Sequence, residues 1–170
     1  MRLFRRQGYA SSGLQQILAE SGAPRGSLYH YFPSGKESLA EAAVQLAGGM
    51  IGEMLLDLAA RHPEPRAFLR AYARTMADWM EESEFQSGCP IATTLLETAP
   101  RSPAITAAGM RAIDAWIDVI AGVFAGAGMA RREARTRAQL VIAAMEGALI
   151  LARVRQSTRP ILDVAKLVDS

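Results

Sequence analysis

The chain contains few of the residues on which enzymes and secreted proteins depend. It has one cysteine, Cys89, and two histidines, His30 and His62. A single cysteine excludes an internal disulfide and agrees with a reducing cytoplasm. Neither histidine is expected beside a nucleophile, and the sequence has no zinc-ligand spacing, carboxylate cluster or phosphate-binding glycine loop. We therefore expect a protein that is not an enzyme and that uses no metal and no cofactor.

Aromatic residues and long apolar runs are also scarce. Phe, Trp and Tyr make up 6% of the 170 residues, and no segment alternates polar and apolar residues over the length of a strand. The longest apolar stretch, 141–152, is interrupted by Glu146 and is too short to cross a bilayer. No signal peptide is recognisable. Half of the residues are hydrophobic, so the chain can bury a substantial core. Because no strand pattern, membrane span or signal peptide is found, we expect an all-α protein located in the cytoplasm.

Residues 8–41 carry the strongest pattern, two short helices around a glycine turn and then a longer helix. Ser12 and Gln15 have the spacing of a capping box, which predicts a first helix of about ten residues. Gly22 is expected to end this helix in a left-handed conformation. Pro24 is expected at the first position of the next helix, where its missing N–H costs nothing.

The residues that follow complete the pattern of a DNA-binding helix-turn-helix. Leu28 and Phe32 lie at i and i+4 and should point inward, which leaves polar side chains for phosphates and base edges. Ser34 and Glu37 have the spacing of a second capping box, which places Lys36 in the first turn of a long helix. Because a cation there opposes the helix dipole, we expect an anion such as a DNA phosphate in front of it.

Positive charge gathers at the same end of the chain. Residues 1–36 contain five basic residues and one acidic residue, a net charge of +4, whereas residues 37–170 contain 14 basic and 16 acidic residues, a net charge of −2. A basic head on a slightly acidic body suits a protein that presents one end to a polyanion. Ordinary scatter of charges is the alternative.

Three motifs resemble those of the tetracycline-repressor (TetR) family. They are Gly-Tyr-x-x-Ser at 8–12, Gly-x-x-x-Gly-Ser-Leu-Tyr-His-Tyr-Phe at 22–32 and Ser-Gly-Lys-Glu at 34–37. The segment 88–97 is similar to the C-terminal domains of the subgroup typified by lincomycin-resistance repressors. The resemblance implies a homodimer that binds operator DNA and releases it when a small molecule enters the C-terminal domain. A packed helical corner with surface aromatics is the alternative.

The resemblance also implies roles for individual residues of the head. The recognition helix would face DNA, and residues before and after it would hold the backbone. The predicted DNA-binding residues are Ser12, Gln15, Arg25, Ser27, Tyr29, His30, Tyr31 and Lys36. Family members carry a complete first helix before the Gly-Tyr pair, whereas only residues 1–7 precede it here. Either this start is truncated or mis-assigned, or a shortened helix braces the head through Leu3 and Phe4.

We divide the chain into a helix-turn-helix domain, 1–41, and a helical domain for ligand binding and dimerisation, 42–170. Two prolines, at 63 and 65, break the pattern between helices, and Ser102 is expected to cap the helix that begins at Pro103. The body helices are predicted at 36–58, 66–82, 91–98, 103–126, 131–156 and 160–168. The whole chain should form about nine helices.

Bulky, adaptable side chains on the body helices fit either a plain core or an apolar ligand pocket. The family resemblance favours the pocket. Its predicted lining is Met76, Trp79, Met80, Phe85, Cys89, Leu95, Met110, Trp116, Met145 and Glu146. We place Glu97 at the edge of this pocket. Glu146 alternatively forms an ion pair with Arg153.

Small residues recur on the helix predicted at 131–156. Small side chains let helices approach closely, so this strip and the last helix would make a self-complementary face. The predicted dimer interface is Ala144, Gly147, Ala148, Leu151, Ile161 and Val164. Packing within one chain is the alternative.

The sequence thus predicts a ligand-responsive, operator-binding transcriptional regulator. We expect a homodimeric repressor that is released from double-stranded operator DNA by a small apolar or aromatic effector, with no membrane partner. One alternative is a small-molecule-binding or interaction module of the same fold that no longer binds DNA. Another is a DNA-binding architectural protein that responds to no ligand.

Overall fold

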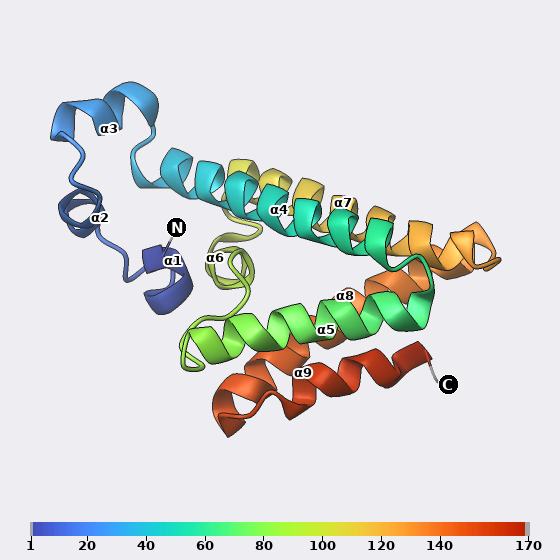
Figure 1. Cartoon of the computed structure of the whole chain (residues 1–170). Helices are drawn as coiled ribbons and strands as arrows, with labels where there is room; N and C mark the ends of the chain where they lie inside the picture. The colour runs from blue at the N-terminus through green and yellow to red at the C-terminus, as the bar shows by residue number, and fades with distance from the viewer. Residues whose placement is uncertain (1, 169–170) are drawn as a thin grey trace. The chain divides into compact units, whose positions relative to one another are not determined.

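The computed structural model describes residues 2–168, and every regular element among them is helical (Figure 1). The elements are α1 Arg2–Gln7, α2 Leu14–Ser21, α3 Arg25–Tyr31, α4 Lys36–Arg61, α5 Pro65–Glu82, α6 Ala92–Thr98, α7 Pro103–Gly126, α8 Arg131–Arg155, α9 Arg159–Val164 and the 3-10 helix η1 Ala165–Val168. The predicted all-α fold is confirmed. The body helices were also predicted correctly, to within three residues at each end, except that the single helix predicted at 160–168 is α9 followed by the 3-10 helix η1.

The chain forms two compact units that no single cut in the sequence separates. Unit 1 comprises Met1–Gly49 and Cys89–Ala112, and unit 2 comprises Met50–Gly88 and Ile113–Ser170. Helices α4 and α7 therefore each contribute a first part to unit 1 and a second part to unit 2. The domain boundary after residue 41 stays a prediction, because the units describe contacts and not which segments fold independently.

Unit 1 contains the predicted head together with α6 and the start of α7. Within it α1 packs against α6, and Phe4 of α1 is buried. Helices α4 and α7 approach closely at Gly48, where an added Cβ would lie 2.5 Å from the Cβ of Ala112. Helices α7 and α6 also approach closely, since a Cβ added at Gly109 of α7 would lie 2.4 Å from a methyl carbon of Leu95 in α6. Glycine is needed at position 48, because the Cβ of Ala112 cannot move without its backbone, whereas the Leu95 side chain could adjust to a Cβ at position 109.

Unit 2 is built on apolar helix faces. Helix α9 packs against α5 and α8, as Figure 1 shows. Helix α5 buries one continuous stripe, and its buried residues are Phe68, Leu69, Tyr72, Ala73, Met76, Ala77 and Met80. This spacing repeats every three or four residues, as the sequence pattern predicts. Helix α4 also packs near Trp116, whose indole would lie at an ordinary contact distance of 3.9 Å from a Cβ added at Gly52.

The first predicted capping box is wrong. Helix α2 has Gly13 at its N-cap and no side-chain cap. The hydroxyl of Ser12 donates instead to the carbonyl of Gly8 at 2.6 Å, and the residue is fully buried. Pro24 occupies the N-cap of α3 and not its first position. The spacing of a capping box is present, but the Ser12 hydroxyl is used in a hydrogen bond within the turn that precedes α2.

The second predicted capping box is wrong for a different reason. The carboxylate of Glu37 accepts a hydrogen bond from the hydroxyl of Ser102, 65 positions away. Ser102 also accepts from the N–H of Ile105 at 3.4 Å, so its predicted role at the start of α7 is confirmed. The Glu37 carboxylate, which the local pattern assigned to a helix cap, therefore binds a residue that is distant in sequence.

Helix α4 is the one helix among the described residues that is long and apolar enough to cross a membrane. An 18-residue stretch of this helix has a mean hydropathy of 1.3, and a third of that stretch is buried. Length and composition are weak evidence, because core helices of soluble proteins have the same properties. The exposed carboxylates of Glu53 and Asp57 lie in its second half.

Candidate nucleic-acid interface

The turn between α2 and α3 has the predicted geometry. Gly22 ends α2 with φ 65° and ψ 8°, a left-handed conformation that glycine adopts without a steric penalty. Leu28 is buried on the inner side of α3, and Phe32 is half-buried just after it. The inward positions of both side chains agree with their i and i+4 spacing. Helix α3 therefore has one packed face and one face available to a partner.

The available face of α3 carries aromatic side chains with polar groups. Tyr29 is 58% exposed and Tyr31 is 72% exposed. His30 is also exposed, and its ring meets that of Tyr31 edge to face with centroids 4.9 Å apart. Exposed tyrosines are unusual in a core-forming helix, and their hydroxyls both donate and accept hydrogen bonds. The predicted side-chain roles of Arg25 and Ser27 lie outside the described part of the structure.

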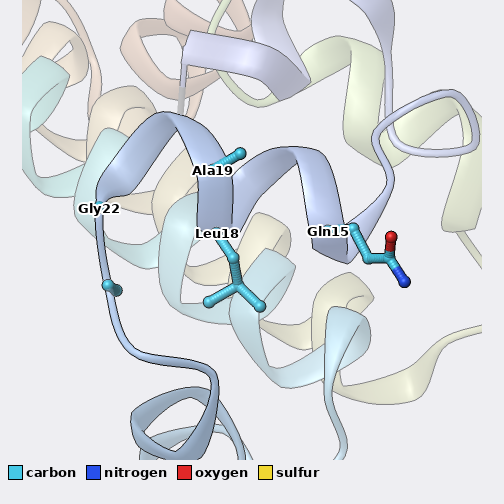
Figure 2. A pocket seen from close by; sticks show the side chains of 5 residues that line it. Gln15, Leu18, Ala19 and Gly22 are labelled. Carbon is cyan, nitrogen blue, oxygen red and sulfur yellow. The ribbon is translucent and has the colours of Figure 1, made fainter.

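The two predicted contacts on the α2 side lie in different surroundings. Gln15 is exposed and lines an open hollow beside the turn, which Figure 2 shows with Leu18, Ala19 and Gly22. Ser12 is buried, and its backbone N–H and hydroxyl both donate within the preceding turn. Contact of either residue with DNA stays a prediction. The hollow beside Gln15 supports the first contact, whereas burial does not favour the second.

Lys36 lies against the turn between α1 and α2. Its ammonium donates to the carbonyl of Ala10 at 3.1 Å and lies 4.5 Å from the centre of the Tyr9 ring. An ammonium has three N–H donors, so one bond to Ala10 leaves donors for a phosphate. Burial raises the pKa of the Tyr9 hydroxyl, and the nearby charge of Glu37 raises it further. The Tyr9 side chain is therefore a neutral phenol at neutral pH, and its contact with Lys36 is a cation–π contact and not an ion pair.

Glu97 makes a contact that sequence reasoning missed. We placed it at the edge of a ligand pocket, whereas its carboxylate accepts from the backbone N–H of Tyr9 at 3.0 Å and of Ala10 at 2.5 Å. Glu97 belongs to α6, and the turn it holds is 87 and 88 positions away. No local signal in the sequence indicates such a contact. An open groove beside it is also lined by Glu37, Arg101 and Ser102.

The predicted ligand residues fall in both units. Cys89, Leu95 and Met110 belong to unit 1, and the remaining predicted residues belong to unit 2. In unit 2 the buried members are Met76, Met80, Trp116 and Met145, while Trp79, Phe85 and Glu146 are half-buried. In unit 1 Cys89 is buried, Leu95 is half-buried and Met110 is 61% exposed. The pocket that would join them stays a prediction.

The predicted dimer residues also differ in exposure. Ala148, Ile161 and Val164 are buried within one chain, whereas Gly147 and Leu151 are exposed and Ala144 is half-buried. Further exposed apolar residues on α8 are Leu140, Ala143, Ile150 and Val154. Together with Gly147 these positions recur at intervals of three and four, so hydrophobic periodicity could have revealed them. We name Leu140, Ala143, Gly147, Ile150, Leu151 and Val154 the α8 stripe.

Among residues 2–168 no cluster of three or more His, Cys, Asp or Glu side chains is arranged to hold a metal ion. Several acidic groups of unit 2 form ion pairs on the surface. Arg135 of α8, for example, contacts both Asp114 and Asp118 of α7. The polar groups of these helices therefore tie neighbouring helices together at the surface.

Two family descriptions match the chain, one toward each end. Residues 1–43 match bacterial regulatory proteins of the tetR family. Residues 65–167 match the C-terminal domain of transcriptional regulators described as LmrA/YxaF-like. Together the matches confirm the resemblance seen in the motifs, including the subgroup indicated by residues 88–97.

Individual relatives agree with these matches. The chain is 32% identical to the HTH-type transcriptional regulator YxaF of Bacillus subtilis, over 98% of this chain and 87% of the relative. It is 30% identical to the HTH-type transcriptional regulator LmrA of the same organism, over 98% and 89%. The fold is similar to that of a TetR transcriptional regulator from Legionella pneumophila, with a TM-score of 0.86, 19% identity, and coverage of 99% of this chain and 90% of that chain.

Proposed function

This chain belongs to the TetR family and is a transcriptional regulator of that family, and we propose that it is a repressor released from operator DNA by a small apolar or aromatic molecule. Members of the family are DNA-binding regulators and not enzymes. The observation that carries the proposal for this chain is the exposed polar aromatic face of α3, opposite the buried Leu28.

The exposed face of α3 suits the major groove of DNA. A helix of this kind docks with its exposed side chains against base edges, while neighbouring groups contact phosphates. Tyr29, His30 and Tyr31 supply donors and acceptors for bases and backbone, and Lys36 supplies a positive charge at the start of α4. Such a protein acts where the chromosome is, which in a bacterium is the cytoplasm.

Homodimers are typical of this family, and we propose that this chain dimerises through the α8 stripe. Exposed aliphatic side chains on one helix face form a contiguous apolar patch, which soluble monomers rarely expose. A two-fold axis would place the stripe of one chain against the same stripe of its partner. The two recognition helices must then lie about 34–36 Å apart to enter successive major grooves.

We propose that the effector binds among the aromatic and methionine side chains of unit 2. Met76, Met80, Trp116 and Met145 combine bulk with adaptability, which suits an apolar ligand. A ligand that binds the DNA-released state better shifts the population toward that state. By linkage, operator DNA must weaken ligand binding by the same factor, typically about 5–150-fold.

DNA binding is tested with an operator selected from random double-stranded DNA by the wild-type protein. Tyr31→Ala should weaken binding to the selected operator about tenfold or more and relax its base preference. Arg25→Ala should also relax base preference, and Arg74→Ala on α5 is its control with the same change of charge. A wild-type protein that selects no sequence would contradict operator binding. The alternative without DNA binding would then be favoured.

Ligand response is tested with a set of small aromatic compounds. Trp79 and Trp116 are the only tryptophans, so binding in unit 2 should change tryptophan fluorescence. The same compounds should weaken operator binding. Trp116→Ala should reduce the affinity for the compound and leave DNA binding without the compound nearly unchanged. Compounds that quench fluorescence without any effect on DNA affinity would contradict the release mechanism.

A further inference from the structure

Glu97 connects two parts of unit 1 that belong to different ends of the chain. It lies on α6, inside the region 65–167 that matches the C-terminal family domain. The backbone groups it binds, the N–H of Tyr9 and of Ala10, lie inside the region 1–43 that matches the DNA-binding domain. We call this contact the Glu97 clamp. It holds the turn that directly precedes α2 of the helix-turn-helix.

The clamped turn is held from its other side as well. The carbonyl of Ala10 accepts from the ammonium of Lys36 at 3.1 Å, while its N–H donates to Glu97 at 2.5 Å. Lys36 is the first residue of α4. Ala10 therefore lies between a carboxylate of α6 and an ammonium of α4. Its two backbone groups are both used, which limits rotation of the turn.

Gly8 makes room for the carboxylate. Its φ is +83°, where L side chains are rarely found, and an added Cβ would lie 2.0 Å from Oε1 of Glu97. The side-chain oxygen thus occupies the space that any larger residue at position 8 would need. The backbone conformation favours glycine here, and a Cβ would also push the Glu97 carboxylate away from its two N–H donors, a cost that exists only while Glu97 is in place.

We propose that Glu97 is a positioning residue for DNA binding, which sets the orientation of α2 and α3 relative to α6 by fixing the turn at 8–10. The proposal rests on the proposed function, because it concerns the same recognition surface. Glu97 itself contacts no DNA in this scheme.

The sign of the effect on DNA binding separates this role from simple electrostatics. Removing a carboxylate from a protein that binds a polyanion should leave affinity unchanged or increase it. Glu97→Gln should instead weaken operator binding about tenfold, because the amide keeps one acceptor and turns an N–H toward the other backbone N–H. Glu41→Gln on α4 is the matched control, since it removes the same charge from the same unit and should not weaken binding.

The experiment uses the operator selected by the wild-type protein and corrects affinity for the active fraction, measured by stoichiometric titration. The dependence of affinity on salt should stay unchanged in Glu97→Gln, because no phosphate contact is lost. Amide hydrogen exchange at Tyr9 and Ala10 should become faster in this variant. A merely structural role would lower the active fraction and leave the affinity of the active molecules as it was, which would overturn the proposal.

A double-mutant cycle tests the clamp without DNA. Gly8→Ala should lower the unfolding temperature more in the wild-type background than in Glu97→Ala, because the steric conflict needs both side chains. Additive effects of the two changes would overturn the clamp itself. If the cycle shows coupling but Glu97→Gln binds operator as tightly as wild type, the positioning role is overturned and the proposed function stands. If the wild-type protein selects no DNA, the proposed function and this role fail together while the cycle still reports the clamp.

Discussion

Units 1 and 2 hold distant parts of the chain together in different ways. In unit 1, carboxylates accept hydrogen bonds from backbone groups and hydroxyls far away in sequence, as Glu97 does from Tyr9 and Glu37 from Ser102. In unit 2, α5, α8 and α9 meet through buried apolar faces. A hydrogen bond contributes about 0.5–1.5 kcal/mol to stability, whereas truncating a buried side chain costs about 2–5 kcal/mol. The contacts of Glu97 and Glu37 can therefore be rearranged at a smaller cost in free energy than the apolar contacts of α5, α8 and α9.

The exposed faces of α3 and α8 differ in a similar way. Helix α3 exposes tyrosines and a histidine, whose polar groups suit phosphates and bases. Helix α8 exposes Leu140, Ile150 and Val154, which offer no hydrogen bonds. Water forms hydrogen bonds with the polar groups on α3, whereas it forms none with the aliphatic side chains on α8. The two faces therefore suit different partners, a polar one for α3 and an apolar one for α8.

The largest effect is expected in the core of unit 2. Phe68 of α5 is fully buried, so Phe68→Ala should lower the free energy of unfolding by about 3–5 kcal/mol. Chemical denaturation monitored by circular dichroism measures it. Leu96→Ala is the control, because Leu96 is 81% exposed and its removal should change stability by less than about 0.5 kcal/mol. Equal losses in both variants would contradict the apolar core as the main source of stability in unit 2.

The next effect concerns the α8 stripe. Ile150→Glu should weaken self-association by about 2–4 kcal/mol, because it places a charge in the centre of an apolar contact. Sedimentation over a range of concentrations measures the dimer dissociation constant. Leu96→Glu introduces the same charge at an exposed position of α6 and should leave the constant unchanged. If Ile150→Glu associates as tightly as wild type, the stripe is not the dimer interface.

Lys36→Ala should have a smaller effect, on both the turn and DNA. Loss of the bond to Ala10 and of the contact with the Tyr9 ring should lower stability by about 1–2 kcal/mol. If Lys36 also contacts phosphate, the slope of log affinity against log salt should fall by about one unit. Lys166→Ala is the matched control, because this exposed lysine of unit 2 pairs with Asp163 on the surface. An unchanged salt slope would restrict Lys36 to a structural role.

The smallest effect is a change in the pH dependence of stability at the start of α5. The backbone N–H of Arg66 and of Ala67 lower the pKa of the Glu64 carboxyl. A carboxyl whose pKa is lower in the folded state stabilises the fold above its unfolded pKa, and this contribution is lost as pH falls through the folded value. Glu64→Gln should therefore reduce the loss of stability between about pH 5 and pH 3.

Thermal unfolding at several pH values measures this dependence. Glu82→Gln, at the opposite end of the same helix, is the control, and the pH dependence of its stability should match that of wild type more closely. If Glu64→Gln and wild type lose stability in parallel on acidification, the cap does not contribute to acid stability.

Local patterns correctly predicted most of the helices and the turn of the head. Gly22 and Ser102 act at helix ends as expected, because both roles depend on residues within a few positions. The inward positions of Leu28 and Phe32 follow from helical periodicity alone. The capping roles of Ser12 and Glu37 were predicted from equally local patterns and are wrong, since each side chain found a partner that the local pattern does not contain.

The register of α8 shows the same limit for apolar residues. Small residues indicated an interface on this helix, but they did not determine which side of the helix a second chain could reach. Ala148 is covered within the chain and Gly147 is not, although they are adjacent in sequence. Helix α8 packs against both α5 and α9. Which side of α8 remains accessible therefore depends on how these helices pack and not on the sequence of α8 alone.

The amino-acid sequence by itself determined the order of the helices, the glycine turn of the head and the family, because periodicity, turn residues and motifs are properties of neighbouring positions. Only the tertiary structure decided that Ser12 is buried, that the α8 stripe stays exposed and that Glu97 binds the turn at 8–10. Each of these depends on how segments pack, and the Glu97 clamp joins groups 87 and 88 positions apart. Contacts at that separation arise when helices pack in space, and no spacing within one segment records them.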